Sequence, residues 1–183
     1  WIGSAVFLIG IGAIYAAVGT LNLADLAIKV AGAGVEQAGL LRTGGLLLLV
    51  EFALKAALIH LGFWLPSASA SASAPAAALF AIMTKVGVYA ILRVHGLIFG
   101  PEGGPAAALL MPWLLPVGLA TVAVATVGVL ASDGLRRLLT HLVVLSAGTL
   151  IIALGLDSEA AASAALYYAL NCTLVGGGLF RLA

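Results

Sequence analysis

Long, almost uniformly apolar runs are the feature that most constrains how this chain can fold. A helix that crosses a bilayer needs about 20 mostly apolar residues, and six segments of the 183-residue chain meet that need. The chain is 63% hydrophobic and 8% charged, whereas soluble domains carry about 25% charged residues. It therefore has too few polar side chains to cover a soluble core of this size. We expect an all-α, polytopic transmembrane helix bundle.

The predicted spans form a single transmembrane domain over residues 1–183. The polar stretch after the first span contains "LADLAIKVA", which predicts a short interfacial helix. The repeat "SASASASA" (Ser67–Ala74) predicts a loop or a loosely ordered crossing, and "GPEGGP" (Gly100–Pro105) predicts a turn. The predicted spans are residues 2–19, 43–61, 75–99, 106–130, 138–155 and 160–183.

Composition excludes several classes of function. The formal net charge of +1 gives no reason to expect a nucleic acid as partner. A single cysteine, Cys172, excludes an internal disulfide and a cysteine-based metal site, and the three histidines lack metal-ligand spacing. We find no Gly-rich phosphate loop, CxxC motif or nucleophile elbow. We therefore expect a transporter rather than an enzyme, with no catalytic residue, metal or cofactor.

Two lysines interrupt the apolar runs where a charge is costly. Lys85 lies ten residues after Pro75, which is about 15 Å along a helix and half of a 30 Å hydrocarbon core. Lys55 has twelve residues of its predicted span before it and six after it. Ionisable groups at this depth cost about 2.5–3.5 kcal/mol on insertion scales and usually line ion or proton pathways. A buried lysine can lose its proton and an arginine cannot, so we predict a proton or cation relay through Lys55 and Lys85.

Glu51 and His141 are the other predicted members of this relay. Glu51 precedes Lys55 by four residues, on the same helical face and in the favourable order. It would tune Lys55 by stabilising its charged form. The alternative is a structural ion pair that holds helices together. His141 lies near the start of the fifth predicted span, and its alternative is a histidine at the membrane interface.

Four further residues are predicted to line the pathway. Ser146 and Thr149 share a helical face and could support a water chain, although hydroxyls in membrane helices often bond back to their own backbone. Tyr167 and Asn171 share a face of the last span, where Asn171 could order water or bridge helices. His60 lies at the end of its predicted span, and we expect it at the interface.

One stretch carries a specific family pattern. Residues Phe52–Val94, "FALKAALIHLGFWLPSASASASAPAAALFAIMTKVGVYAILRV", hold a lysine, then "WLP", then an alanine-rich segment, then "KVGVYA". This order resembles the proton-translocating antiporter-type subunits shared by respiratory complex I, membrane-bound hydrogenases and Mrp-type antiporters. The stretches "GTLNLADLA", "RRLLTHLVVLSAGTLI" and "ALYYALNCTLVGGGLF" favour the D-type branch of these subunits, found in multisubunit Na⁺/H⁺ (Mrp/Pha-type) antiporters. The resemblance covers essentially the whole chain.

The resemblance implies a longer subunit built from two inverted halves, each with a broken helix, of which this chain is a central fragment. It implies that Lys55 is the family's central-span lysine and Lys85 the lysine of the next span. The implied function is that of a membrane subunit of a cation (Na⁺ or K⁺)/proton antiporter. Its partners would be the other subunits of a hetero-oligomeric complex and the lipid bilayer. The implied location is the bacterial inner membrane.

Two other functions fit the same pattern. One is a proton-pumping subunit of complex I or of a membrane-bound hydrogenase, coupled to electron transfer. The other is a structural subunit that conducts no ions. The chain also departs from the family pattern at four positions. Glu51 stands where the family has a small or aliphatic residue, and His60 stands where it has a proline. Asn171 stands where a histidine is common, and Arg181 stands at an otherwise apolar position.

Overall fold

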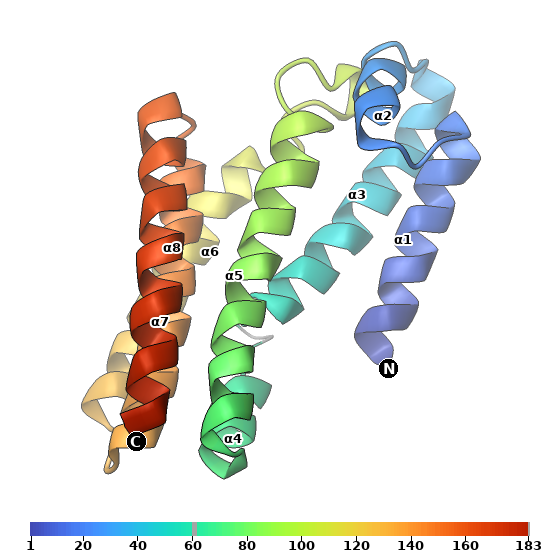
Figure 1. Ribbon diagram of the computed structural model, residues 1–183. Helices are drawn as coiled ribbons and strands as arrows, with labels where there is room; N and C mark the ends of the chain where they lie inside the picture. The colour runs from blue at the N-terminus through green and yellow to red at the C-terminus, as the bar shows by residue number, and fades with distance from the viewer. Residues whose placement is uncertain (60–61, 183) are drawn as a thin grey trace. The chain divides into compact units, whose positions relative to one another are not determined.

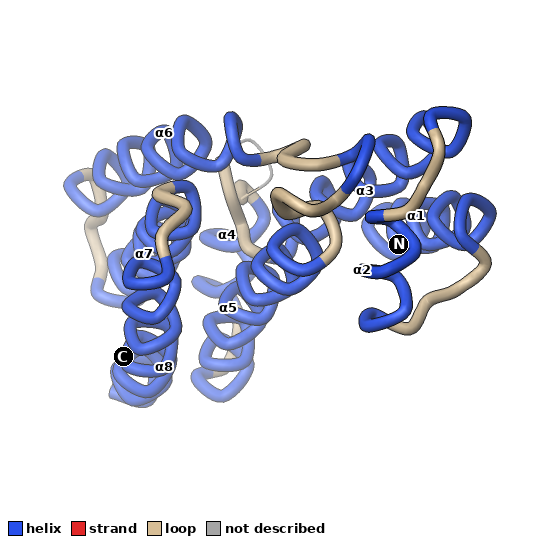
Figure 2. The backbone as a smooth tube through the Cα atoms, turned by 90° about the horizontal axis from the view of Figure 1, so that it is seen from above, coloured by secondary structure: helices blue, strands red, loops and turns tan. Residues whose placement is uncertain are grey.

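The computed structural model describes residues 1–59 and 62–182, and every regular element among them is a helix (Figure 2). His60, predicted at the interface, lies outside the described residues. In chain order the helices are α1 (Ile2–Val18), α2 (Leu23–Ala31), α3 (Val35–Lys55), α4 (Trp64–Ser71), α5 (Ala74–Leu97), the short 3₁₀ helix η1 (Gly104–Ala106), α6 (Met111–Leu130), α7 (Leu135–Gly155) and α8 (Glu159–Leu182), as Figure 1 shows.

Four helices of the described residues are long and apolar enough to cross a membrane. They are Val35–Lys55, Ala74–Leu97, Gly104–Leu130 and Leu135–Gly155. Helices α1 and α2 are bent by 56° at a short break, and together they count as a fifth if the pair forms one span. The all-α membrane bundle is thus confirmed, but the described residues give four to five candidate spans rather than the six predicted, and α8 is not among them. The short helix expected at "LADLAIKVA" is also confirmed, as α2.

The prediction for "SASASASA" was wrong, because most of this repeat is helical. Helix α4 begins at Trp64 and runs through Ser71. Pro66 falls in its first turn, where a missing backbone N–H breaks no helical bond. The serine hydroxyls bond within the helix, from Ser67 to Trp64 O at 3.1 Å and from Ser71 to Ser67 O at 2.8 Å. Low sequence complexity is therefore not a reliable sign of a loop in this segment.

The predicted bounds of the second span were also wrong. Helix α3 begins at Val35 and ends at Lys55, so Lys55 occupies the last turn and has no helical residues after it. The chain then turns, and Ala57 takes a left-handed conformation with φ of 55°. An alanine gains nothing from that conformation, so surrounding contacts must hold the break in place. A run of apolar residues gives no sign of such a break.

The helices form two compact units. Unit 1 contains Trp1–Ala53 and Tyr89–Pro112, and unit 2 contains Leu54–Val88 and Trp113–Ala183. In unit 1, glycines allow α1 and α3 to approach closely. A Cβ atom added to Gly44 would lie 2.6 Å from Ile14 Cγ1 and 2.9 Å from the carbonyl oxygen of Gly10. Small residues at such positions are typical of packed membrane helices.

Unit 2 contains most of the predicted pathway residues. Its helices α7 and α8 pack along each other, and α4 packs on α7. The Arg136 guanidinium at the start of α7 donates to the carbonyl oxygen of Ala72, just after α4, at 2.9 Å. A core of buried apolar side chains joins these helices: Ala57, Leu65, Ala77, Ala81, Leu139, Val143 and Phe180.

Replacing Gly44 with alanine tests the close packing of α1 and α3. The added methyl group would overlap Ile14 and the α1 backbone, and we expect a loss of about 1–3 kcal/mol in the free energy of unfolding. Gly39 is the matched control on the same helix, since a Cβ there meets nothing within 4 Å. Gly39→Ala should gain about 0.5–1 kcal/mol through lower backbone entropy in the unfolded state. Unfolding of the full-length subunit in detergent measures both, and equal effects would contradict the packing.

Candidate functional site

Lys85 lies on α5 in the interior of unit 2. Its side chain is only 7% exposed, and its Nζ atom donates to the hydroxyl oxygen of Ser146 at 2.6 Å. Longer contacts join Nζ to Thr84 Oγ1 at 3.4 Å and to the carbonyl oxygen of Val143 at 3.5 Å. All three acceptors are neutral oxygen atoms. Such atoms solvate an ammonium group, but they do not cancel its charge as a carboxylate would.

The two hydroxyl groups are oriented toward Lys85 by their own helices. Ser146 donates its proton to the carbonyl oxygen of Val143 at 2.7 Å, and Thr84 donates to the carbonyl oxygen of Ala81 at 2.8 Å. A hydroxyl has one proton and two lone pairs. Because each proton is already used, each oxygen presents lone pairs to the amine. The Lys85 site is therefore built to receive hydrogen bonds from nitrogen.

A cavity of about 210 Å³ adjoins Lys85 and Ser146. Helix α8 contributes Tyr168, Asn171 and Cys172 to its wall. The Tyr168 side chain also interacts with Cys172 and with Thr149 of α7. One water occupies about 30 Å³ in the liquid and needs two to four polar partners. The cavity therefore has both the room and the polar groups for several water molecules next to the lysine amine.

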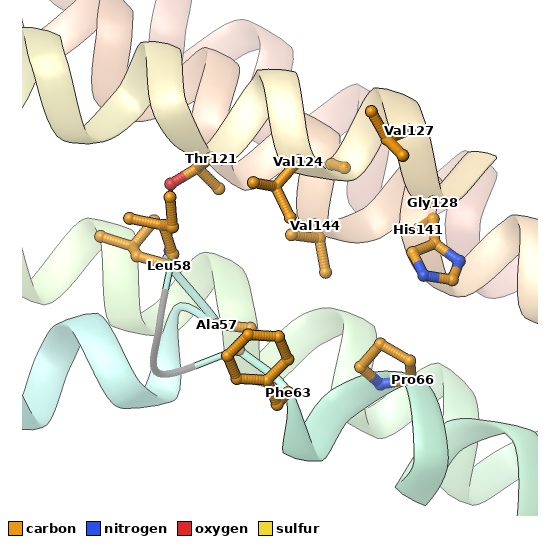
Figure 3. A pocket seen from close by; sticks show the side chains of 13 residues that line it. Ala57, Leu58, Phe63, Pro66, Thr121, Val124, Val127, Gly128, His141 and Val144 are labelled. Carbon is orange, nitrogen blue, oxygen red and sulfur yellow. The ribbon is translucent and has the colours of Figure 1, made fainter. Parts of the chain in front are cut away.

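His141 lines a second cavity in unit 2, of about 280 Å³ (Figure 3). Its Nδ1 atom lies 2.9 Å from the carbonyl oxygen of Arg137. A carbonyl can only accept, so Nδ1 carries a proton and Nε2 is the nitrogen left to exchange one. The ring lies over Gly128, where an added Cβ would be 2.6 Å from Nε2. Apart from His141 and Thr121, the walls of this cavity are almost entirely apolar.

The same cavity is bordered by the break that follows Lys55. Two side chains bond to backbone groups at the break, one of which, the carbonyl oxygen of Leu54, also accepts from the Ala57 amide at 3.2 Å. The indole N–H of Trp64 donates to the carbonyl oxygen of Leu54 at 3.0 Å, and Thr121 accepts from the amide of Ile59 at 3.1 Å. Unsatisfied backbone groups are very costly in a membrane. These two bonds therefore explain how a non-helical segment is tolerated here.

The predicted site residues occupy several places. Lys85, Ser146 and Asn171 share one cavity, and Thr149 reaches it through Tyr168. The Thr149 hydroxyl itself bonds back to Leu145 O at 3.0 Å. His141 lies in the other cavity.

The remaining predicted residues are not among those that line the Lys85 cavity. Lys55 is exposed at the end of α3, a favourable place for a cation because the helix dipole is negative there. Tyr167 is 80% exposed and does not line the Lys85 cavity. Glu51 lies in unit 1, only 2% exposed.

Sequence reasoning missed Thr84, Tyr168 and Cys172. Tyr168 and Cys172 share a helical face four residues apart, about 100° around α8 from the pair that we chose. Both pairs fit helical spacing equally well. Only the packing of α8 on α7 decides which face meets Lys85.

Replacing Ser146 with alanine tests the Lys85 site. Ser146→Ala removes the 2.6 Å acceptor, and hydrogen bonds to charged groups contribute about 1.5–3 kcal/mol. We expect a loss of that size in the free energy of unfolding of the full-length subunit. Thr173→Ala is the control, because that hydroxyl donates to Ala169 O of its own helix. The loss from Ser146→Ala should vanish in a Lys85→Met background. An unchanged loss there would contradict the pairing.

Comparison with known proteins places this chain in a family. The family model of the NADH:quinone oxidoreductase/Mrp antiporter transmembrane region matches residues 1–183. The D subunit of a probable K⁺/H⁺ antiporter of Rhizobium meliloti (strain 1021) is 44% identical over 179 residues, which are 98% of this chain and 33% of that protein. The D subunit of the Na⁺/H⁺ antiporter of Bacillus subtilis (strain 168) is 37% identical over 183 residues, which are 100% of this chain and 36% of that protein. The chain thus spans about a third of the length of these curated relatives.

Solved structures agree with this placement. A chain of the membrane-bound sulfane sulfur reductase, an archaeal respiratory membrane complex, matches with a TM-score of 0.86 and 28% identity, over 98% of this chain and 36% of that one. A chain of the Mrp complex from Dietzia sp. DQ12-45-1b matches with a TM-score of 0.83 and 26% identity, over 98% and 32%. Sequence and fold therefore agree that the chain belongs to the NADH:quinone oxidoreductase/Mrp antiporter transmembrane family, as part of a longer multi-pass membrane protein of the D-subunit type.

Proposed function

We propose that the chain is the central part of the D subunit of a multisubunit antiporter that exchanges Na⁺ or K⁺ for protons across a bacterial inner membrane. Its partners are the other subunits of that complex. The observation that carries the proposal is the position of Lys85, whose buried amine donates to the neutral oxygens of Ser146, Thr84 and Val143 beside a cavity with room for water. A lysine in that setting can take up and release a proton, as an arginine cannot.

The names of the relatives support the antiporter reading. The Rhizobium meliloti relative is a probable K⁺/H⁺ antiporter subunit and the Bacillus subtilis relative a Na⁺/H⁺ antiporter subunit. We propose a monovalent cation as the exchanged ion on that ground. Vesicles that contain the whole complex, assayed with Na⁺ and with K⁺ in turn, identify which one this chain serves.

In the proposed pathway, the Lys85 cavity is one hydrated station of a proton relay. Ser146 and Asn171 line that station, and Thr149 interacts with Tyr168, which also lines it. Lys55 forms a second station at the end of α3, and His141 a third, with Nε2 as the exchanging atom. Tyr167 stays a predicted pathway residue, because segments outside this chain would decide what its exposed ring contacts.

A second candidate function is proton pumping coupled to electron transfer. The observation in its favour is the match to the respiratory sulfane sulfur reductase complex. The two functions differ in partners, since a pump needs redox subunits and an antiporter does not. The neighbouring genes distinguish them, because they would encode antiporter subunits alone or redox subunits as well.

Substitutions of Lys85 test the relay. In vesicles that contain the complete complex, Lys85→Arg keeps a positive charge but cannot release it. We therefore expect Lys85→Arg to lose nearly all antiport, as Lys85→Met does. The control is Lys29→Met, which removes an exposed lysine paired with Asp25 at 3.0 Å on α2 and should leave antiport near the wild-type level.

Assembly has to be measured with transport in this experiment. Immunoblotting of the purified complex gives the amount of assembled subunit, and antiport is expressed per assembled complex. A purely structural role predicts that Lys85→Arg transports normally once assembled. Full antiport by the arginine variant would refute the relay.

A further inference from the structure

A buried carboxyl group lies at the contact between α1 and α3 in unit 1. Glu51 belongs to the buried face of α3, which also includes Gly44, Leu48 and Phe52. Its side chain is only 2% exposed. Ionisable residues within membrane spans are rare and are functional by default. The carboxyl group therefore needs an explanation beyond helix packing.

The first turn of α1 is shaped to receive this carboxyl group. A Cβ atom added to Gly3 would overlap Glu51 Oε2, and it would lie 3.3 Å from Cδ and 3.5 Å from Oε1. All three atoms of the carboxyl group thus lie against the Cα of Gly3. Any residue other than glycine would displace the group.

The next contact along the same interface is different in kind. A Cβ atom added to Gly10 of α1 would lie 3.2 Å from Leu47 Cβ and 3.3 Å from both Gly44 O and Leu48 Cδ2. Gly10 therefore receives backbone and apolar atoms and no carboxyl group. Gly12, two residues on, meets nothing within 4 Å of an added Cβ. Three glycines of one helix thus have three distinct surroundings.

The two helices of this contact carry few charged residues in their sequences. Helix α1 carries no Asp, Glu, Lys, Arg or His between Ile2 and Val18. On α3 the next charged residue after Glu51 is Lys55, one turn further along. The other titratable side chains of unit 1 are Tyr15 on α1, Asp25 and Lys29 on α2, Glu36 and Arg42 on α3, Tyr89, Arg93 and His95 on α5, and Glu102 in the following loop.

We propose that Gly3 and Glu51 form a proton-binding site between α1 and α3, in which Glu51 carries a transported proton and Gly3 is the residue that positions its carboxyl group. The ligand is a proton, because a single carboxyl group lacks the several oxygen ligands that a metal cation requires. The site adds an acidic station to the relay under Proposed function and rests on that function. It explains why an acid is tolerated at this position of α3.

The site makes a distinctive prediction for Gly3. Gly3→Ala removes no titratable group, yet it should impair proton carriage, because the new methyl group displaces the Glu51 carboxyl group. Its effect should resemble that of Glu51→Gln. Once Glu51 is Gln, adding Gly3→Ala should cause little further loss of antiport. Two independent structural defects would instead combine.

Infrared difference spectroscopy tests the site directly. Spectra of the complete complex are taken in acidic and in alkaline buffer and subtracted. We expect Glu51→Gln to remove one carboxylic acid C=O band and Gly3→Ala to shift the same band. Gly10→Ala changes the α1–α3 packing without touching the carboxyl group, and Gly12→Ala touches neither, so both should leave the band in place.

The outcomes separate this site from the relay as a whole. A band that survives Glu51→Gln would overturn proton binding at Glu51, even if Lys85 proves essential for antiport. A band that Gly3→Ala leaves unshifted would overturn the positioning role of Gly3. Loss of the band in Glu51→Gln and full antiport by Lys85→Arg would keep this site while refuting the Lys85 relay.

Discussion

The hydrogen bond between Lys85 and Ser146 is the interaction on which the functional account depends. It fixes an amine within unit 2, where its other acceptors are also neutral oxygens. A carboxylate in place of Ser146 would hold the ammonium form firmly, and an apolar side chain would leave the amine unsatisfied. Neutral oxygens do neither, so the site suits a group that changes charge during each transport cycle.

At the break after Lys55, hydrogen bonds from distant residues stabilise polar groups of the backbone, as they stabilise the amine of Lys85. A membrane helix can end inside the protein only where other groups satisfy its free N–H and C=O groups. Trp64 bonds to the carbonyl oxygen of Leu54 before the break, and Thr121 bonds to the amide of Ile59 within it. Broken helices in transporters place charged or polar ends near transported ions. Lys55 at the end of α3 has that character, and the nearby cavity carries His141.

Much of the architecture could be predicted from the sequence, because apolar run length alone decides whether a helix can span a bilayer. The ends of α1 and α2 fell within one residue of the expected helices. The break at Lys55 and the helix through Ser67–Ser71 could not be predicted. The break is held by contacts to residues distant in sequence, such as Thr121, and the serines bond within their own turn.

Some residues of the candidate site could also be predicted from the sequence, and others could not. Lys85 could be identified from the sequence because a charged residue in the middle of a membrane span is energetically costly. That cost can be recognised without knowing which residues contact the lysine. Which residues of α8 line its cavity could not be predicted, because Tyr167 with Asn171 and Tyr168 with Cys172 have the same spacing; Asn171, Tyr168 and Cys172 line it and Tyr167 does not. The contact of Glu51 with α1 could not be predicted from the sequence either. Its helical spacing indicated Lys55 as its neighbour, while the structure adds Gly3 of α1.

Measuring the protonation state of Lys85 tests the proposed proton relay most directly. Nitrogen NMR of the full-length subunit, with lysine labelled at Nζ, distinguishes an ammonium from a neutral amine. The Lys85 signal is assigned by its loss in Lys85→Arg. We predict that this signal changes from ammonium to amine within the pH range in which the antiporter is active. A signal that remains ammonium throughout that range would contradict the proposed relay.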